Sequence, residues 1–215
     1  RESGYISEAV INMLSFLGWS PGTTQEIFSM EELIEAFSLN RVGKAGAKFD
    51  FDKTRWFNQQ YLRLKTKEDL TQDLQIILKE NGVEANDNFV ATVCEQLKER
   101  STFVKDMWVE GKYYFESPTS YDEKIIRKKW KEDTPKYLSE LKDRLSELSD
   151  FSSKTIEIEF KKYLEENELA MGMLLPAFRV SLTGLGMGPS LFDIASLLGK
   201  EETKQRIETA LEKIN

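Results

Sequence analysis

The sequence has 215 residues, 40% hydrophobic and 31% charged, which suits one large domain or two small ones and excludes a disordered chain. Its net charge of -7 argues against a generally basic nucleic-acid-binding surface but leaves room for a local cluster of lysine and arginine. Because it contains no histidine, a Cys–His nucleophile is excluded, and we expect no catalysis by this chain alone.

The cysteine content, the lengths of the apolar runs and the first residue bear on the cellular environment expected for the chain. A single cysteine, Cys94, cannot form an internal disulfide, so we expect a reducing, cytoplasmic environment, and its apolar helical spacing predicts a buried core thiol. No run of about 18 apolar residues occurs, so we expect no membrane span. The sequence starts with Arg1 instead of Met, and we expect it to be part of a longer or processed chain.

The first part of the chain predicts helices joined by turns. Ser29 and Glu32 have the spacing of a capping box, which marks the start of a helix. The alternation around Phe49 and Phe51 favours one short strand within the loop that follows. Apolar residues at helical spacing predict three helices here, over residues 5–17, 30–37 and 52–64.

From Thr66 onward the pattern becomes almost continuously helical, and this change predicts a domain boundary after residue 65. Asn81-Gly82 predicts a helix end, and Ser120 with Glu123 predicts a second capping box. The aromatic-rich residues 111–115 favour an extended segment, and a further break is expected within 117–134. Helices are expected to start near residues 66, 86, 102, 120, 134, 153 and 200.

Residues 173–203 form the most distinctive stretch, which predicts a helix, a glycine-rich break, a second helix and the start of a third. The break contains three glycines, which reach positive φ without steric cost: Gly184, Gly186 and Gly188. Pro189 is expected at the first position of the second helix and Gly199 at its end. Arg179 lies within the otherwise apolar first helix, which indicates that it meets something negative or polar.

Two motifs have competing interpretations. The glycine-rich break lacks the Gly-Lys-Ser/Thr ending of a phosphate-binding loop, so a packed corner between helices is favoured over a phosphate cradle. Residues 124–131 are the densest basic cluster and are able to follow a phosphate backbone, although a solvated helix face is the commoner role of such a cluster. The residues alone therefore indicate a helical binding module.

Two stretches resemble the C-terminal portion of bacterial glutamyl-tRNA synthetases, a family of class I aminoacyl-tRNA synthetases. Residues 4–61 contain the patterns GY..EA..N.L..LGWSPG, EIFS.EELIE.F and FD..K..W.N..Y. Residues 173–203 contain FRVSLTG, GPSLFDI and LLGKEET. Between these ends the match is looser, with QLKERSTFVKDM over residues 96–107.

The resemblance implies a mainly α fold, with a helical stem-contact region over residues 1–65 followed by an all-helical anticodon-binding domain over 66–215. The family's ATP-site motifs, HIGH and a KMSKS-like loop, do not occur in the sequence. It therefore implies that the Rossmann-type catalytic domain, with its ATP and magnesium, is absent from this chain. No cofactor or metal is expected to bind here.

The resemblance also implies residue roles. Three residues match anticodon-contacting positions: Arg100, Arg179 and Leu191. A guanidinium fork suits the edges of splayed bases, and an apolar side chain suits their faces. Lys98-Glu99 precedes Arg100 in place of the commoner R-x-R pattern, and Gly43 and Ala45 replace a hydroxyl residue of the family. Stem contacts are implied for three residues: Lys44, Arg55 and Asn58.

The function implied is the tRNA-binding part of an ATP-dependent glutamate–tRNA ligase. Its partner would be glutamate tRNA, with no DNA or membrane partner, and the parent enzyme would be a cytoplasmic monomer. An alternative from a different class is a helical protein–protein interaction module without RNA binding. A third possibility is a nondiscriminating parent that also charges glutamine tRNA, against which Arg100 argues.

Overall fold

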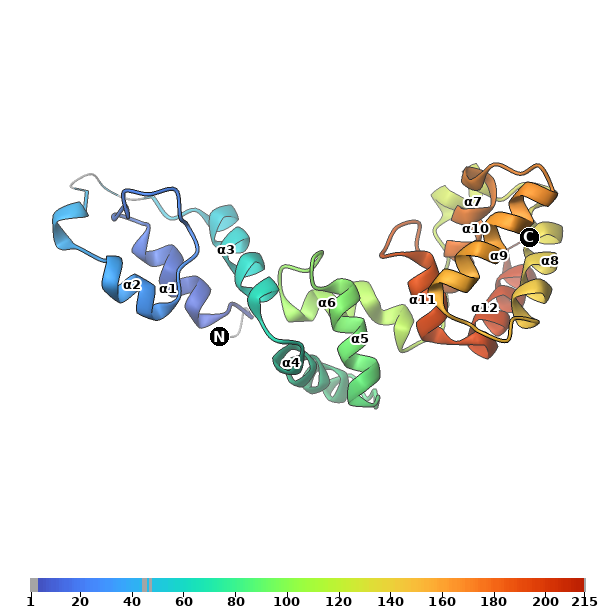
Figure 1. The fold of residues 1–215 in the computed structure, drawn as a ribbon, viewed down its shortest axis with the longest axis horizontal. Helices are drawn as coiled ribbons and strands as arrows, with labels where there is room; N and C mark the ends of the chain where they lie inside the picture. The colour runs from blue at the N-terminus through green and yellow to red at the C-terminus, as the bar shows by residue number, and fades with distance from the viewer. Residues whose placement is uncertain (1–3, 44–45, 47, 215) are drawn as a thin grey trace. The chain divides into compact units, whose positions relative to one another are not determined.

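The computed structural model describes residues 4–43, 46 and 48–214 as a succession of helices (Figure 1). This described part forms twelve α-helices and two 3-10 helices, and its β pairing is an isolated antiparallel bridge between Trp19 and Val42. The mainly α fold predicted from the sequence is confirmed. None of the described helices is long and apolar enough to cross a membrane.

The chain forms two compact units, Arg1–Val109 and Glu110–Asn215. The predicted boundary after residue 65 rested on a change in composition, but packing continues across that position. The side-chain amide of Asn58 donates to the backbone carbonyl of Thr102 over 2.6 Å, so residues on both sides of position 65 are joined. The division by packing lies after residue 109, and the boundary after residue 65 stays a prediction about two regions of the family.

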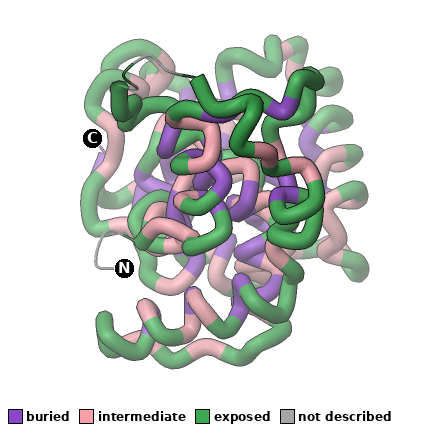
Figure 2. The backbone as a smooth tube through the Cα atoms, turned by 90° about the vertical axis from the view of Figure 1, so that its left-hand side faces the viewer, coloured by how far each residue is buried: buried purple, intermediate pink, exposed green. Residues whose placement is uncertain are grey.

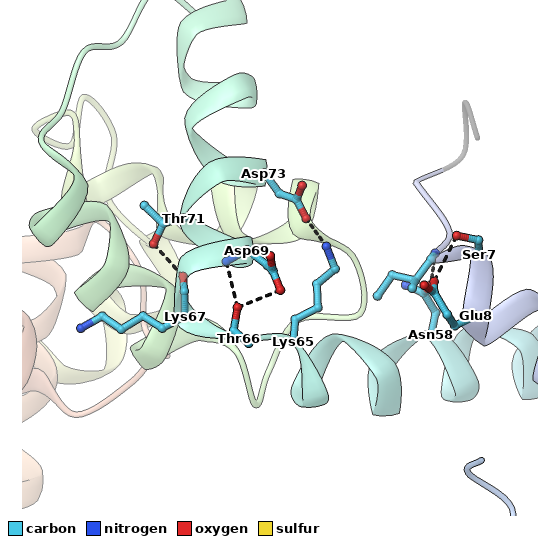
Figure 3. Close-up of polar contacts among 10 residues, drawn as sticks. Ser7, Glu8, Asn58, Lys65, Thr66, Lys67, Asp69, Thr71 and Asp73 are labelled. Carbon is cyan, nitrogen blue, oxygen red and sulfur yellow. Dashed lines mark hydrogen bonds and ion pairs between the residues drawn. The ribbon is translucent and has the colours of Figure 1, made fainter. Parts of the chain in front are cut away.

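In the first unit, side chains satisfy the free N–H groups at several helix starts. The capping box predicted at Ser29 and Glu32 is present. Thr66 accepts from the backbone N–H of Asp69 over 3.1 Å, as Figure 3 shows. The helices of this part are α1 (Ser7–Ser15), α2 (Met30–Ala36), η1 (Leu39–Arg41), α3 (Phe51–Leu64), α4 (Lys67–Glu80), α5 (Asp87–Leu97) and α6 (Val104–Gly111), of which α6 ends within the second unit.

The short strand predicted around Phe49 and Phe51 does not form. Instead, the side chain of Asp50 accepts from the backbone N–H of Lys53 over 3.0 Å, and Phe51 becomes the first residue of α3. The two phenylalanine rings pack edge to face with their centroids 4.9 Å apart. The alternation therefore reflects a helix cap between two aromatic side chains.

Apolar side chains on the facing sides of helices form the interior of the first unit, and Figure 2 shows the buried positions alternating with exposed ones along the chain. Phe57 of α3 is fully buried in a cluster with Ala9 and Met13 of α1. Asn12, also fully buried, accepts from the hydroxyl of Tyr61 over 2.7 Å. α4 packs against α5 through leucines such as Leu74.

The second unit is built around one large cluster of buried apolar residues from α8, α9, α10, α11 and α12. Leu138, Leu141 and Leu145, whose spacings of three and four residues place them on one helix face, are buried. Gly199 ends α11 with φ +84°, as predicted. The elements of this unit are η2 (Lys112–Tyr114), α7 (Glu123–Lys129), α8 (Thr134–Ser146), α9 (Ser153–Glu166), α10 (Met171–Thr183), α11 (Leu191–Leu198) and α12 (Lys200–Lys213).

Three local predictions in this unit were wrong. Residues 112–114 form η2 instead of an extended segment. The cap of α7 is Asp122 instead of Ser120, because the Asp122 carboxylate accepts from the backbone N–H of Lys124 over 2.9 Å. Pro189 precedes α11, whose cap is Ser190 and whose first residue is Leu191.

A buried arginine joins three elements of the second unit. Arg206 of α12 is 3% exposed, and its Nη1 donates to the carbonyl of Tyr113 over 2.6 Å and to that of Leu182 over 2.8 Å. Its Nε donates to Glu202 over 2.6 Å. Burying a charge is costly unless it is paired and hydrogen-bonded, and here both conditions hold. Arg206 therefore holds η2 and the end of α10 against α12.

Replacing this guanidinium should destabilise the second unit. We expect Arg206→Met, which keeps an apolar stem, to lower the free energy of unfolding by about 2–5 kcal/mol, because two buried carbonyls lose their donor. Lys213→Met, at an exposed position on the same helix, is the control and should change stability little. Urea unfolding followed by circular dichroism measures both. Equal stabilities of the two variants would contradict this role.

The same cluster predicts a pH dependence. Although burial raises the pKa of Glu202, hydrogen bonds from Ser117 and Arg206 outweigh it and lower this pKa below its ordinary value of 4.5. A lowered folded-state pKa contributes stability that is fully present above pH 4.5 and is lost as the pH falls through the folded-state value. The stability difference between the unsubstituted chain and Glu202→Gln should therefore narrow below that pH in urea unfolding. A difference that widens on acidification would contradict the assignment.

Candidate nucleic-acid interface

Arg100 lies on a turn that follows α5, and cationic side chains hold the backbone of that turn. Lys98 Nζ donates to the carbonyl of Lys65 over 2.9 Å, and Arg63 Nη2 donates to the carbonyl of Glu99 over 2.7 Å. The Arg100 backbone N–H bonds to the carbonyl of Leu97 over 3.0 Å, and the residue is exposed. Lys98 and Glu99, which depart from the family pattern, thus make contacts that hold the backbone from which the Arg100 side chain extends.

Arg179 lies on α10 and supports the glycine-rich loop that follows this helix. Its Nη2 donates to the carbonyl of Pro189 over 2.8 Å. Its Nη1 is 3.0 Å from where a Cβ at Gly188 would be, so the loop backbone and the guanidinium approach each other closely at this glycine. Arg179 is half-buried. The polar contact predicted for this arginine is, in the first place, with its own loop.

At each of the three loop glycines, a Cβ atom would point toward other protein atoms. A Cβ at Gly184, whose φ is +74°, would lie 2.5 Å from the carbonyl oxygen of Ser120. One at Gly186 would lie 2.5 Å from Cγ1 of Ile125 on α7. The predicted helix–helix corner is thus present, and its glycines allow close packing of the loop against the unit.

The two residues between these glycines are exposed. Leu185 is 44% exposed and Met187 is 77% exposed, while the glycines on either side of each face the protein. The beginning of the loop is fixed by two hydrogen bonds: Leu185 N–H donates to Thr183 Oγ1 over 3.1 Å, and Asp122 N–H donates to the carbonyl of Gly184 over 2.8 Å. Sequence reasoning did not single out this pair, although the alternation of glycine with Leu and Met was the available signal.

Leu191 is placed differently from what its predicted role requires. It is the first residue of α11, is 2% exposed and belongs to the large apolar core of the second unit. A side chain in that position packs against other protein side chains and presents almost no surface to a base. The geometry therefore favours a packing role for Leu191.

The candidates for stem contact also differ from one another. Arg55 is exposed on α3, and the described structure records no hydrogen bond or ion pair for its side chain. Asn58 is fully buried and, besides its bond to Thr102, accepts from the backbone N–H of Ile6 over 2.8 Å (Figure 3). This geometry favours a structural role for Asn58. Lys44 lies outside the described residues.

The single thiol of the chain lies in the core of the first unit. Cys94 is fully buried, as predicted, and burial, with smaller contributions from Glu95 and Asp73, raises the pKa of its thiol to about 12. The thiol is therefore protonated at neutral pH and a poor nucleophile. No group of three or more His, Cys, Asp or Glu residues placed to hold a metal ion occurs in the described part of the chain.

The packing of the loop can be tested at a single glycine. We expect Gly186→Ala to lower the free energy of unfolding by about 1–3 kcal/mol, because its new methyl group would overlap Ile125. Gly172→Ala is the control in the same unit: nothing lies within 4 Å of a Cβ there. This control should be neutral or stabilising by up to about 1 kcal/mol. If thermal unfolding gave both variants the same stability, the tight packing would be contradicted.

Comparison with protein families identifies two matching segments. Residues 59–211 match the family described as "Anticodon binding domain". Residues 1–56 match the family described as "tRNA synthetases class I (E and Q), catalytic domain". The predicted stem-contact region is thus matched by the family model of the catalytic domain, and the two matches meet near the boundary predicted at residue 65.

Individual relatives and solved structures agree with these matches. A glutamate–tRNA ligase of Phocaeicola vulgatus is 48% identical over 212 residues, which are 99% of this chain and 42% of the relative. One of Porphyromonas gingivalis is 45% identical over the same shares. The crystal structure of a glutamate tRNA ligase from Elizabethkingia meningosepticum, in complex with its amino acid, has a TM-score of 0.96 and 42% identity and covers 100% of this chain and 43% of that one. The chain thus spans less than half the length of these relatives.

Proposed function

Since this chain belongs to the anticodon-binding-domain family and corresponds to the C-terminal portion of glutamyl-tRNA synthetases, we propose that it binds the anticodon arm of glutamate tRNA. The observation that carries the proposal is the family match over residues 59–211, which includes both arginines expected to read the anticodon. Arg100 starts from a turn held by Lys98 and Arg63, and Arg179 from a helix that supports the glycine-rich loop. A backbone that is already braced loses little freedom when the side chains it carries bind a partner.

The chemistry of these residues suits unpaired bases. A guanidinium group presents five donors in a planar fork, which matches the acceptor edges of bases that have left the stack. Phosphate contacts from local cations would supply affinity, although the chain as a whole carries a net charge of -7. Of the two stem-contact candidates that the structure describes, Arg55 is exposed and Asn58 is buried, so Arg55 is the one placed to meet a tRNA stem.

The parent enzyme is proposed to be a glutamate–tRNA ligase that attaches glutamate to this tRNA in the cytoplasm, as a monomer and without a DNA partner. ATP and magnesium would serve a catalytic domain, for which this chain has neither the HIGH nor the KMSKS-like motif. The contribution of this chain would be selection: it binds the matching tRNA and thereby brings the correct acceptor to the catalytic domain. We propose that the chain itself binds no cofactor.

The two arginines provide the test. We expect Arg100→Ala and Arg179→Ala each to weaken binding of glutamate tRNA by about 1–3 kcal/mol and to reduce discrimination against a changed anticodon. Binding is measured by fluorescence anisotropy with transcripts that differ only in the anticodon. Lys79→Ala, also a loss of one positive charge, is the control and should bind like the unsubstituted chain. Variants that discriminate as well as the unsubstituted chain would contradict the assignment.

Leu191→Ala provides a contrast between reading and packing. Because Leu191 is buried, we expect this change to lower the free energy of unfolding by about 2–5 kcal/mol. If Leu191→Ala left the stability unchanged but reduced discrimination between anticodons, Leu191 would instead be a residue that contacts the anticodon bases. If the chain binds no tRNA, or if its tRNA binding does not weaken as the salt concentration rises, the alternative of a protein–protein interaction module is favoured.

A further inference from the structure

The second unit carries an exposed apolar pair beside an exposed basic helix face. Leu185 and Met187 form what we call the loop tip. Their exposed fractions are 44% and 77%. Because the flanking glycines pack against protein atoms, the loop tip is held outward by a backbone that has little room to collapse. Exposed apolar side chains on a braced loop are suited to a binding partner.

The basic face belongs to α7 and consists of Lys124, Arg127 and Lys128, all exposed. At 100° per residue these three positions lie within about 100° of one another on the helix. Ile126, on the opposite side of the helix, packs against the core, and Ile125 packs there as well from a position between Ile126 and the basic face. The described structure records no side-chain hydrogen bond or ion pair for the three cations. The basic cluster predicted from the sequence is therefore an outward face free to meet anions.

Direct contacts join the loop to α7. The missing Cβ of Gly186, between the two loop-tip residues, faces Cγ1 of Ile125 at 2.5 Å. Ile125 follows Lys124 directly and lies one helical turn before Lys128. Asp122, which caps α7, bonds through its N–H to the carbonyl of Gly184 over 2.8 Å. The loop that carries the loop tip is therefore packed against α7, next to the side of the helix that carries the basic face.

We propose that the loop tip and the basic face together bind unpaired RNA nucleotides, with Leu185 and Met187 against base faces and the cations of α7 along the phosphates. This inference rests on the proposed function and extends it to residues outside the expected set. Single-stranded nucleic acids are bound by positive surfaces that follow the backbone, combined with side chains that pack on bases. Glu123 is the one carboxylate on this side of α7, so the face keeps an excess of positive charge.

The surface continues at the end of α7. Three lysines, Lys128, Lys129 and Lys131, and one carboxylate, Asp133, line a hollow of about 270 Å³ together with Tyr137 and the start of α10. Lys129 donates to the carbonyl of Gly172 over 3.0 Å and so holds one wall of this hollow. A phosphate that follows the basic face would find cations along this direction as well.

The test compares two variants of the full chain with matched controls on α9. The loop-tip variant is Leu185→Gln/Met187→Gln, and its control is Ile158→Gln, at a position that is 57% exposed. The basic-face variant is Lys124→Gln/Arg127→Gln/Lys128→Gln, and its control is Lys154→Gln/Lys161→Gln/Lys162→Gln. Each chain is titrated by fluorescence anisotropy, over a range of salt concentrations, with a glutamate tRNA transcript and with a fully paired RNA duplex of equal phosphate number. Circular dichroism melts confirm that every variant folds.

We expect the loop-tip variant to bind the transcript at least about fivefold more weakly, with an unchanged salt slope and unchanged duplex binding, because only unpaired bases expose their faces. The basic-face variant should reduce the slope of log K against log salt by about 2, because three phosphate contacts are lost at roughly 0.7 each. Both controls should behave like the unsubstituted chain.

The outcomes separate the two proposals. If the unsubstituted chain binds the transcript with a steep salt dependence and either variant matches its control, this inference is overturned and the proposed function stands. If the unsubstituted chain binds no tRNA, both are overturned. A loop-tip variant that loses duplex and transcript binding equally would overturn the contact with unpaired bases.

Discussion

The second unit depends on one buried cation, the guanidinium group of Arg206. Its bonds to the carbonyls of Tyr113 and Leu182 hold η2 and the last turn of α10 against α12. Leu182 lies two residues before Gly184, where the glycine-rich loop begins. With Glu202 beside it the buried charge is compensated, so the contact fixes the position from which the loop leaves α10. The proposed RNA surface thus depends on a contact in the protein interior.

Local sequence signals predicted most of the helices, because caps and apolar spacing act over a few residues. Ser29 with Glu32, Thr66 and Gly199 all act as predicted. The predictions were wrong where the local sequence is compatible with two structures, such as two possible helix caps. Asp122 displaced Ser120 as a cap. Residues 112–114 formed a 3-10 turn, and Arg206 from the last helix holds the carbonyl of Tyr113 in that turn.

The candidate site was only partly accessible to sequence reasoning, because residue type does not reveal exposure. Leu191 and Asn58 were named from their positions in a family pattern, yet the fold buries both. Arg206 looked like an ordinary polar residue of the last helix, and its role requires the carbonyls of two other elements to be in place. Met187 carried no motif of its own, and only the packing of the neighbouring glycines shows why it is exposed. Burial and long-range polar contacts are properties of the assembled core.

The central claim is that this chain recognises the anticodon arm of glutamate tRNA. The most direct measurement is chemical footprinting of that tRNA, read nucleotide by nucleotide with and without the chain. We predict protection of the anticodon nucleotides and of the backbone next to them, and this protection should weaken as the salt concentration rises. Absence of protection, or protection confined to parts of the tRNA outside the anticodon arm, would contradict it.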